Sequence, residues 1–124
     1  MTEEIWRLGA CETALAIREG KYSCLEVVQS AVDRLSTVNP DLNAVTVDLT
    51  KEALDAAKEA DLALSNGIKA GPLYGVPITL KENIDLEGKA TTLGVSHFLN
   101  NVAPGDAPVV RSLKEAGAII IGQT

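Results

Sequence analysis

The strongest constraint on the fold is a short run of apolar residues near the end of the sequence. Residues 107–116, with Asp106 as the expected N-cap, have the pattern of a helix, and Gly117 ends it. Ala118-Ile119-Ile120-Ile121 then forms a fully apolar run. A strand without polar alternation is typical of a parallel sheet that is covered on both faces. A helix, a short loop and a buried strand in this order predict an α/β fold.

Two shorter segments are predicted to be further strands. Val76–Leu80 is apolar, and Pro77 within it favours an edge strand or the start of a strand, since proline cannot donate to a ladder. Ala44–Val47 is short and rich in β-branched residues, which is typical of a strand. The sequence therefore predicts about three strands, together with about four helices.

The predicted helices are recognised by their periodicity and by the residues at their ends. The first covers residues 10–19 and stops at Gly20. The second begins at a capping box, in which Ser23 and Glu26 each satisfy a backbone N–H of the first turn, and it ends at Asn39-Pro40. The other two helices are predicted at residues 51–65 and 107–116.

The charge and hydropathy of the chain exclude several classes of protein. With 11 basic and 17 acidic side chains the formal net charge is −6, whereas a nucleic-acid surface needs clustered Lys and Arg. No apolar run approaches the ~20 residues of a membrane-spanning helix. The start, Met1-Thr2-Glu3-Glu4, is acidic where a signal peptide is basic. We therefore expect a soluble cytoplasmic protein without direct contact with nucleic acid or membrane.

The cysteine and histidine content does not indicate a metal or a cofactor. Cys11 and Cys24 form no CxxC pair, and because both lie in predicted helices we expect buried free thiols rather than a redox pair. His97 is the only histidine, and no paired Cys or carboxylate motif accompanies it. A structural or solvated histidine is therefore favoured over a zinc ligand, and neither a metal nor a cofactor is expected.

Lys81 is the residue that the local pattern singles out for chemistry. It follows the predicted strand Val76–Leu80 beside a loop rich in Gly and Pro, and the functional groups of α/β sheets gather at such strand ends. Apolar surroundings disfavour a charged ammonium group and let a lysine act as a base. The alternative is an ordinary lysine that is solvated or paired with Glu82 or Asp85.

The segment around Lys81 resembles the motif of the amidase signature family. Residues 71–85, GPLYGVPITLKENID, follow the pattern GPL-x-G-[VI]-P-x-x-x-K-[DE]-N, and the resemblance covers nearly the whole chain. The other matching segments are Thr91-Thr92, PGDAPVV at 104–110, LKEAGAIIIGQT at 113–124, and NPDLNA at 39–44 together with the Ser23 capping box. The positions that depart from the commoner family residues are Glu82, Val95 and Gln123.

This resemblance implies the N-terminal part of an α/β/α layered amidase fold with a mixed sheet. Residues 1–124 would be the N-terminal segment of an amidase-signature domain, with a mainly helical front part at 1–70 and the catalytic-lysine segment, with strands, at 71–124. Three strands cannot complete a sheet of the family's size. We therefore expect Ile119–Ile121 to have an unpaired edge or an uncovered face, and the chain to self-associate or to need the rest of the domain.

The resemblance also implies a Ser-Ser-Lys catalytic triad, of which this chain carries Lys81 alone. In the family a neutral lysine takes a proton from a bridging serine on a cis peptide bond. That serine activates a second serine, which attacks the amide carbonyl and forms an acyl-enzyme. Both serines, and a Gly/Ser-rich loop that stabilises the oxyanion, lie downstream of the matching region. None of the serines present here is assigned a role, so the chain alone is expected to be inactive.

Three functions are compatible with the sequence. The first is an amidase that hydrolyses a small-molecule carboxamide to the acid and ammonia or an amine. The second is the amidase-like subunit of a tRNA-dependent amidotransferase, which uses the same triad and passes ammonia to partner subunits. The third is a non-catalytic α/β module that keeps only the front of the fold. The amidase is favoured, and the sequence does not identify its amide substrate.

Overall fold

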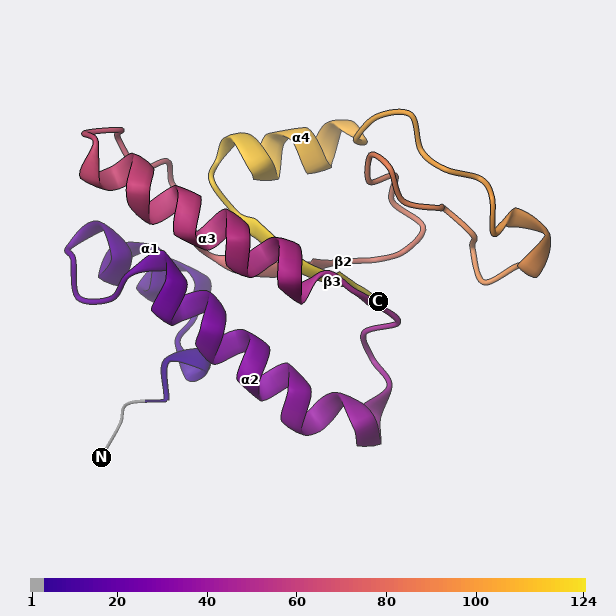
Figure 1. Ribbon diagram of the computed structural model, residues 1–124, viewed down its shortest axis with the longest axis horizontal. Helices are drawn as coiled ribbons and strands as arrows, with labels where there is room; N and C mark the ends of the chain where they lie inside the picture. The colour runs from indigo at the N-terminus through magenta and orange to yellow at the C-terminus, as the bar shows by residue number, and fades with distance from the viewer. Residues whose placement is uncertain (1–3) are drawn as a thin grey trace.

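The computed structural model describes residues 4–124, which form four α-helices, two 3₁₀ helices and a three-stranded sheet (Figure 1). Residues 1–3, part of the acidic start that favoured a cytoplasmic protein, lie outside the described residues. The strand predicted at Ala44–Val47 is shorter and begins later than expected. In chain order the elements are η1 (Ile5–Arg7), α1 (Ala10–Arg18), α2 (Cys24–Leu42), β1 (Val47–Asp48), α3 (Thr50–Ser65), β2 (Pro77–Leu80), η2 (Ser96–Phe98), α4 (Pro108–Glu115) and β3 (Ile119–Gln123).

The sheet is mixed, and β3 is its central strand. It runs antiparallel to β1, with Gln123 opposite Val47, and parallel to β2, with Ile120 opposite Ile78. Along Ile119–Ile121 one edge pairs with β2, whereas β1 pairs only with Gly122 and Gln123, and the Leu49 N–H donates to the Ile121 carbonyl at 3.2 Å. Within residues 4–124, the second edge beside Ile119 and Ile120 therefore has no strand partner, as predicted. The proline of β2 lies at the start of an edge strand, where its missing N–H costs no ladder bond.

Helices cover both faces of the sheet, which gives the α/β/α layering expected from the family resemblance. Ile119 and Ile121 pack with α2 and α3 in one buried cluster. Ile120, which alternates to the other face, packs with Val110 of α4 in a second cluster. Figure 1 shows α2 and α3 side by side and α4 apart from them. The other half of the prediction, an uncovered face, is therefore wrong for β3.

The start of α2 is capped twice. As the capping box predicted, the Glu26 N–H donates to the Ser23 hydroxyl at 3.0 Å, and the Ser23 N–H donates to the Glu26 carboxylate at 2.8 Å. Asp61 of α3 provides a second cap, because its carboxylate accepts from the N–H groups of Cys24 and Leu25 at 2.7 and 3.0 Å. The second cap also ties α2 to α3.

The end of α2 differs from the prediction, since the helix passes through Asn39-Pro40 and continues to Leu42. Pro40 lies in the last turn, where its missing N–H removes only one helical hydrogen bond. The helix ends at Asn43, which adopts a left-handed backbone with φ 48°. The Asn39 amide donates to and accepts from the backbone of Val45, at 3.0 and 2.9 Å, and so fixes the turn toward β1.

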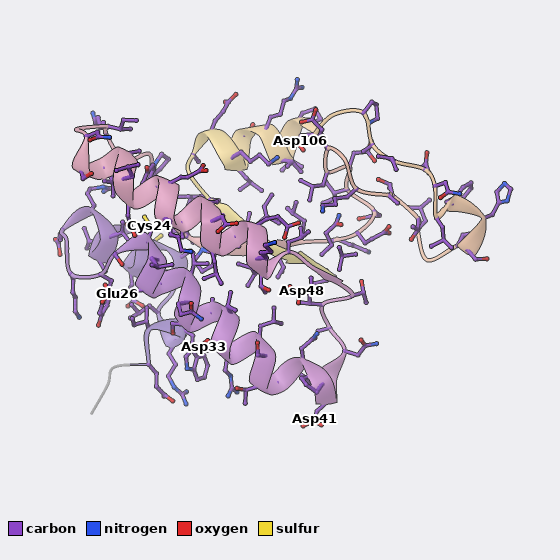
Figure 2. All side chains as sticks on the ribbon, in the orientation of Figure 1. Cys24, Glu26, Asp33, Asp41, Asp48 and Asp106 are labelled. Carbon is purple, nitrogen blue, oxygen red and sulfur yellow. The ribbon has the colours of Figure 1, made fainter. Side chains whose placement is uncertain are left out.

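The start of α4 also differs from the prediction, because Asp106 does not cap this helix. Its carboxylate instead accepts from the Glu87 N–H at 2.8 Å and from Lys114 Nζ at 2.7 Å. Figure 2 shows Asp106 beside the start of α4. The helix begins at Pro108, and a proline in the first turn leaves one donor fewer to be capped. Asp106 therefore ties the loop at residue 87 to the helix.

The two cysteines have different environments. Cys11 is exposed, so the prediction of a buried thiol is wrong for this residue, whereas it is confirmed for Cys24. Burial and the nearby Asp61 carboxylate raise the pKa of Cys24 to about 12. A thiol that stays protonated is a poor nucleophile, so the surroundings of Cys24 are those of a structural cysteine. Cys11 lies outside the buried face of α1, which consists of Thr13, Ala14, Ala16 and Ile17.

Candidate functional site

Lys81 lies where the parallel strands β2 and β3 both end. The backbone on each side of it is held by hydrogen bonds: the Thr124 N–H donates to the Leu80 carbonyl at 2.8 Å, and the Glu82 N–H donates to the Thr124 carbonyl at 2.9 Å. The carboxyl ends of parallel strands are the places where open α/β sheets bind their ligands. The strand-end position predicted for Lys81 is therefore confirmed by the structure.

An open cleft of about 610 Å³ lies at Lys81. The Lys81 side chain is exposed, and its ammonium group has no hydrogen bond or ion pair within residues 4–124. Residues 4–124 therefore do not provide the apolar surroundings in which a lysine becomes a base. The residues that line the cleft are Thr46, Lys81, Glu82, Asn83, Thr92, Leu93, Gly94 and Thr124.

Glu82 connects the turn after β2 to the turn at residues 92–94. Its carboxylate accepts hydrogen bonds from the backbone N–H groups of Thr92 and Leu93, the second at 3.0 Å. The bond from the Thr92 N–H is the main cause that lowers the pKa of Glu82, because it favours the charged carboxylate. Leu93 has a left-handed backbone with φ 54°, which is uncommon for a residue other than glycine.

The carboxylate of Asp85 holds Thr91, the residue before the turn at residues 92–94. Asp85 accepts a hydrogen bond from the Thr91 hydroxyl at 2.6 Å. The backbone of Thr91 also bonds to Asn101, whose side-chain amide donates to the Thr91 carbonyl at 3.0 Å. Thr91-Thr92 appeared in the sequence only as part of a motif. Their contacts with Glu82 and Asp85 depend on the tertiary fold, so sequence reasoning missed them.

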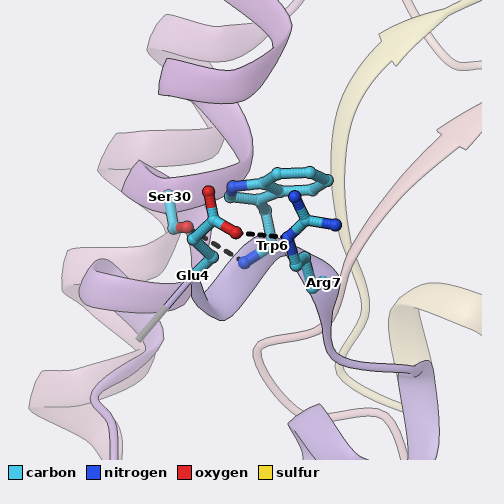
Figure 3. A network of polar contacts seen from close by, with 4 residues as sticks. All are labelled: Glu4, Trp6, Arg7 and Ser30. Carbon is cyan, nitrogen blue, oxygen red and sulfur yellow. Dashed lines mark hydrogen bonds and ion pairs between the residues drawn. The ribbon is translucent and has the colours of Figure 1, made fainter. Parts of the chain in front are cut away.

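Another polar network fixes η1 on α2 (Figure 3). The Trp6 N–H donates to the Ser30 hydroxyl at 3.1 Å, and Glu4 forms an ion pair with Arg7. The guanidinium carbons of Arg7 and Arg34 lie 4.4 and 4.3 Å from the centroid of the Trp6 ring, within the range of cation–π contacts. No sequence motif marks this network, and none of its residues lines the cleft at Lys81.

His97 lies in η2, and its ring meets the Phe98 ring edge to face, with 5.5 Å between the centroids. The histidine is exposed. Across residues 4–124, no three His, Cys, Asp or Glu side chains gather as they would around a metal ion. In the same part of the chain, no helix has the length and apolar character needed to cross a bilayer.

The layered fold and the lysine at the carboxyl ends of two parallel strands define an α/β protein with a candidate site at its strand ends. Fatty acid amide hydrolase superposes with a TM-score of 0.94 at 29% identity, over all of this chain and 22% of that one. Residues 26–124 match the profile of the Amidase family. The chain belongs to the amidase family, as the sequence motifs predicted.

Two curated relatives bear on the function. Indoleacetamide hydrolase from Bradyrhizobium diazoefficiens is 53% identical over 120 residues, which are 97% of this chain and 23% of that protein. A glutamyl-tRNA(Gln) amidotransferase subunit from Carboxydothermus hydrogenoformans is 36% identical over 121 residues, 98% of this chain and 25% of that protein. The chain thus spans about a quarter of the length of the relatives that it matches. The catalytic role of Lys81 stays a prediction.

Proposed function

We propose that this chain is the N-terminal segment of an amide hydrolase and that Lys81 is its catalytic lysine. The observation that carries the proposal is the 53% identity with an indoleacetamide hydrolase over 97% of the chain. The open cleft at Lys81, where β2 and β3 end, supports it. Within the domain, we assign residues 1–70 to a mainly helical front part and residues 71–124 to the catalytic-lysine segment.

In the proposed mechanism, Lys81 in its neutral form accepts a proton from a bridging serine, which takes the proton of the nucleophilic serine. The nucleophilic serine attacks the amide carbonyl, the amine leaves with a proton, and water hydrolyses the acyl-enzyme to the acid. The two serines belong to sequence that follows the matching segment in the family. That sequence would also provide the apolar cover that lets a lysine act as a base. This serine–lysine chemistry needs no cofactor.

The proposed substrate is a carboxamide with an apolar aromatic acyl group, and indole-3-acetamide is the compound to test first. The name of the 53% identical relative supports this choice. Leu93 supports it as well, because its side chain lines the cleft and is 60% exposed, which suits contact with an apolar acyl group. Hydrolysis of this amide would yield indole-3-acetic acid and ammonia.

A second candidate is the amidase-like subunit of a tRNA-dependent amidotransferase. The 36% identity with a subunit of glutamyl-tRNA(Gln) amidotransferase favours it over other amidase-type functions. Such a subunit would use the same triad but deliver ammonia to partner subunits. We rank it second because its identity with this chain is lower than that of the hydrolase.

Ammonia release by the natural gene product, purified without partner proteins, distinguishes the candidates. The hydrolase is expected to release ammonia from indole-3-acetamide with saturable kinetics and to release far less from glutamine. Release from glutamine that depends on added partner subunits would favour the amidotransferase. No release from any carboxamide would contradict both and would favour a non-catalytic module.

The loop between β2 and α4 provides a surface for the rest of the domain or, in its absence, for a second copy of the chain. Figure 1 shows this loop extending away from the sheet. Exposed apolar patches mark interaction surfaces. We therefore propose that the rest of the domain, or a second copy of the chain, buries this surface. Its exposed apolar side chains are those of Leu93, Val95, Phe98, Leu99 and Val102. A cytoplasmic location is a separate part of the proposal.

A further inference from the structure

The turn at residues 92–94 is held in an unusual backbone conformation beside the lysine. Leu93 has φ 54° and Gly94 has φ 74°, so two consecutive residues adopt the left-handed conformation. A side chain on Cβ makes this conformation unfavourable for leucine. The turn therefore needs contacts from outside itself to persist.

Glu82 supplies those contacts. The N–H groups of Thr92 and Leu93 are adjacent in the chain, and both donate to the carboxylate of Glu82, one to each oxygen. Hydrogen bonds from N–H groups to a charged carboxylate are stronger than those to a neutral acceptor. Since Glu82 immediately follows Lys81, a single side chain couples the lysine turn to the 92–94 turn.

Backbone N–H groups are the hydrogen-bond partners of the Glu82 carboxylate. Its pKa is lowered by the hydrogen bonds from the turn, and no ion pair of Glu82 with a lysine or arginine is found within residues 4–124. The negative charge of Glu82 is thus satisfied by backbone N–H groups and not by a cation. Thr91, the residue before Thr92, is held by a second carboxylate, because its hydroxyl donates to Asp85.

We propose that Glu82 is a positioning residue that fixes the Thr92–Leu93 turn as the wall of the substrate cleft at Lys81. The inference rests on the proposed function and adds a specificity element to it. Leu93 lines the cleft together with Lys81, so the turn that Glu82 holds sets the distance between the lysine and an apolar wall. That wall contacts the acyl group of the amide, and its contribution grows with the size of that group.

The test compares Glu82→Gln and Glu82→Asp with the wild-type natural gene product. Glu59→Gln is the matched control, because Glu59 is an exposed residue of α3 and its change removes the same charge. Hydrogen exchange of the Thr92 and Leu93 amides reports on their hydrogen bonds to Glu82 and requires no activity. Steady-state kinetics with indole-3-acetamide and with acetamide report on the contact with Leu93, since the two amides share the acetamide unit and only the first carries an apolar aromatic ring on it.

In Glu82→Gln, exchange of the two amides should become about tenfold faster, because an amide side chain is a weaker acceptor than a carboxylate. KM for indole-3-acetamide should rise about tenfold, while kcat and the KM for acetamide change less than about threefold. Glu82→Asp keeps the carboxylate, so its amide exchange rates and its KM for indole-3-acetamide should both lie close to those of the wild type. Glu59→Gln should resemble the wild type.

Two results would overturn the inference while leaving the proposed function in place. One is unchanged exchange at Thr92 and Leu93 in Glu82→Gln. The other is an equal loss of activity on both amides, which a merely structural role would produce. A wild-type protein that hydrolyses neither amide would instead contradict the proposed function, and the inference would fall with it.

Discussion

The backbone N–H of Glu82 donates to the carbonyl of Thr124 at 2.9 Å, so the residue that follows Lys81 pairs with the residue that follows β3. This bond extends the parallel pairing of β2 and β3 by one step beyond Leu80 and Gln123. It fixes the backbone from which the Lys81 side chain leaves the sheet. A lysine anchored in this way at strand ends is in the position where α/β proteins bind substrates.

The 124-residue chain alone should not hydrolyse amides. It carries one of the three residues of the proposed triad, and a lysine without a serine nucleophile cannot form an acyl-enzyme. The measurement is ammonia release from a panel of simple carboxamides, including indole-3-acetamide. Saturable turnover that disappears in Lys81→Ala would contradict the prediction, because it would require another nucleophile within these residues.

Gly75→Ala should destabilise the protein more than Gly88→Ala does. Both glycines have a left-handed backbone, with φ 79° and 78°, so both substitutions carry a backbone cost of about 1–2 kcal/mol. A Cβ at Gly75 would also lie 2.6 Å from Cys24 Sγ and 2.7 Å from Ile17 Cδ1, whereas no atom lies within 4 Å of a Cβ at Gly88. Overpacking adds about 1–3 kcal/mol at Gly75.

The free energy of unfolding in urea, measured for both glycine variants of the natural gene product, checks this difference. Gly88→Ala is the control for the backbone conformation, and the excess at Gly75 reports the packing of α1 and α2 against the loop. Equal losses of stability in the two variants would show that this close packing does not exist in solution.

The Asp106–Lys114 contact should make stability depend on pH in the acidic range. The hydrogen bonds from Lys114 and from the Glu87 N–H lower the pKa of Asp106 below its ordinary value of 3.8. A carboxylate with a lowered pKa in the folded state stabilises the protein above its unfolded pKa, and this contribution is lost as the pH falls through the folded pKa.

Asp106→Asn should therefore lower the free energy of unfolding by about 1–2 kcal/mol at neutral pH. The difference between wild type and variant should shrink as the pH falls below about 4. Asp55→Asn is the matched control, since Asp55 and its partner Lys58 are both 63% exposed and their contact contributes little. A difference between Asp106→Asn and wild type that stays constant from neutral pH to pH 3 would contradict the assignment.

Local sequence signals predicted the elements of the fold well where one residue type decides the outcome. The capping box at Ser23, the turn at Gly20 and the end of α4 at Gly117 are all confirmed. Pro40 misled the prediction because a proline in the last turn costs one bond, and other contacts of the helix outweigh that loss. Asp106 misled it because its carboxylate has partners in another segment, which no local pattern reveals.

Contacts between segments that are distant in the sequence could not be predicted from local patterns. The two residues of β1 pair with Gly122 and Gln123, far along the chain, so no local pattern near the end of β3 indicates that its second edge is occupied there. The same holds for the site. Lys81 was predicted from its motif, whereas its proximity to Leu93 follows from the hydrogen bonds that Glu82 makes across an intervening loop.

The isolated chain should self-associate through the loop between β2 and α4. Leu99 and Leu62 are both exposed, at 64% and 63%, but Leu99 lies among the apolar side chains of the loop and Leu62 lies on α3. Leu99→Ser should reduce the mean mass measured by light scattering at high protein concentration, and Leu62→Ser should not. A strictly monomeric wild-type chain at all concentrations would contradict the prediction.

The most direct test of the central claim, that Lys81 is the catalytic lysine of an amide hydrolase, is ammonia release from indole-3-acetamide by the natural gene product and by Lys81→Ala. We predict that kcat/KM falls by about 10³-fold or more in Lys81→Ala and also in Lys81→Arg, whose guanidinium cannot accept a proton. Lys69→Ala, at another exposed lysine, should retain wild-type activity. Near-normal turnover in Lys81→Ala would contradict the account.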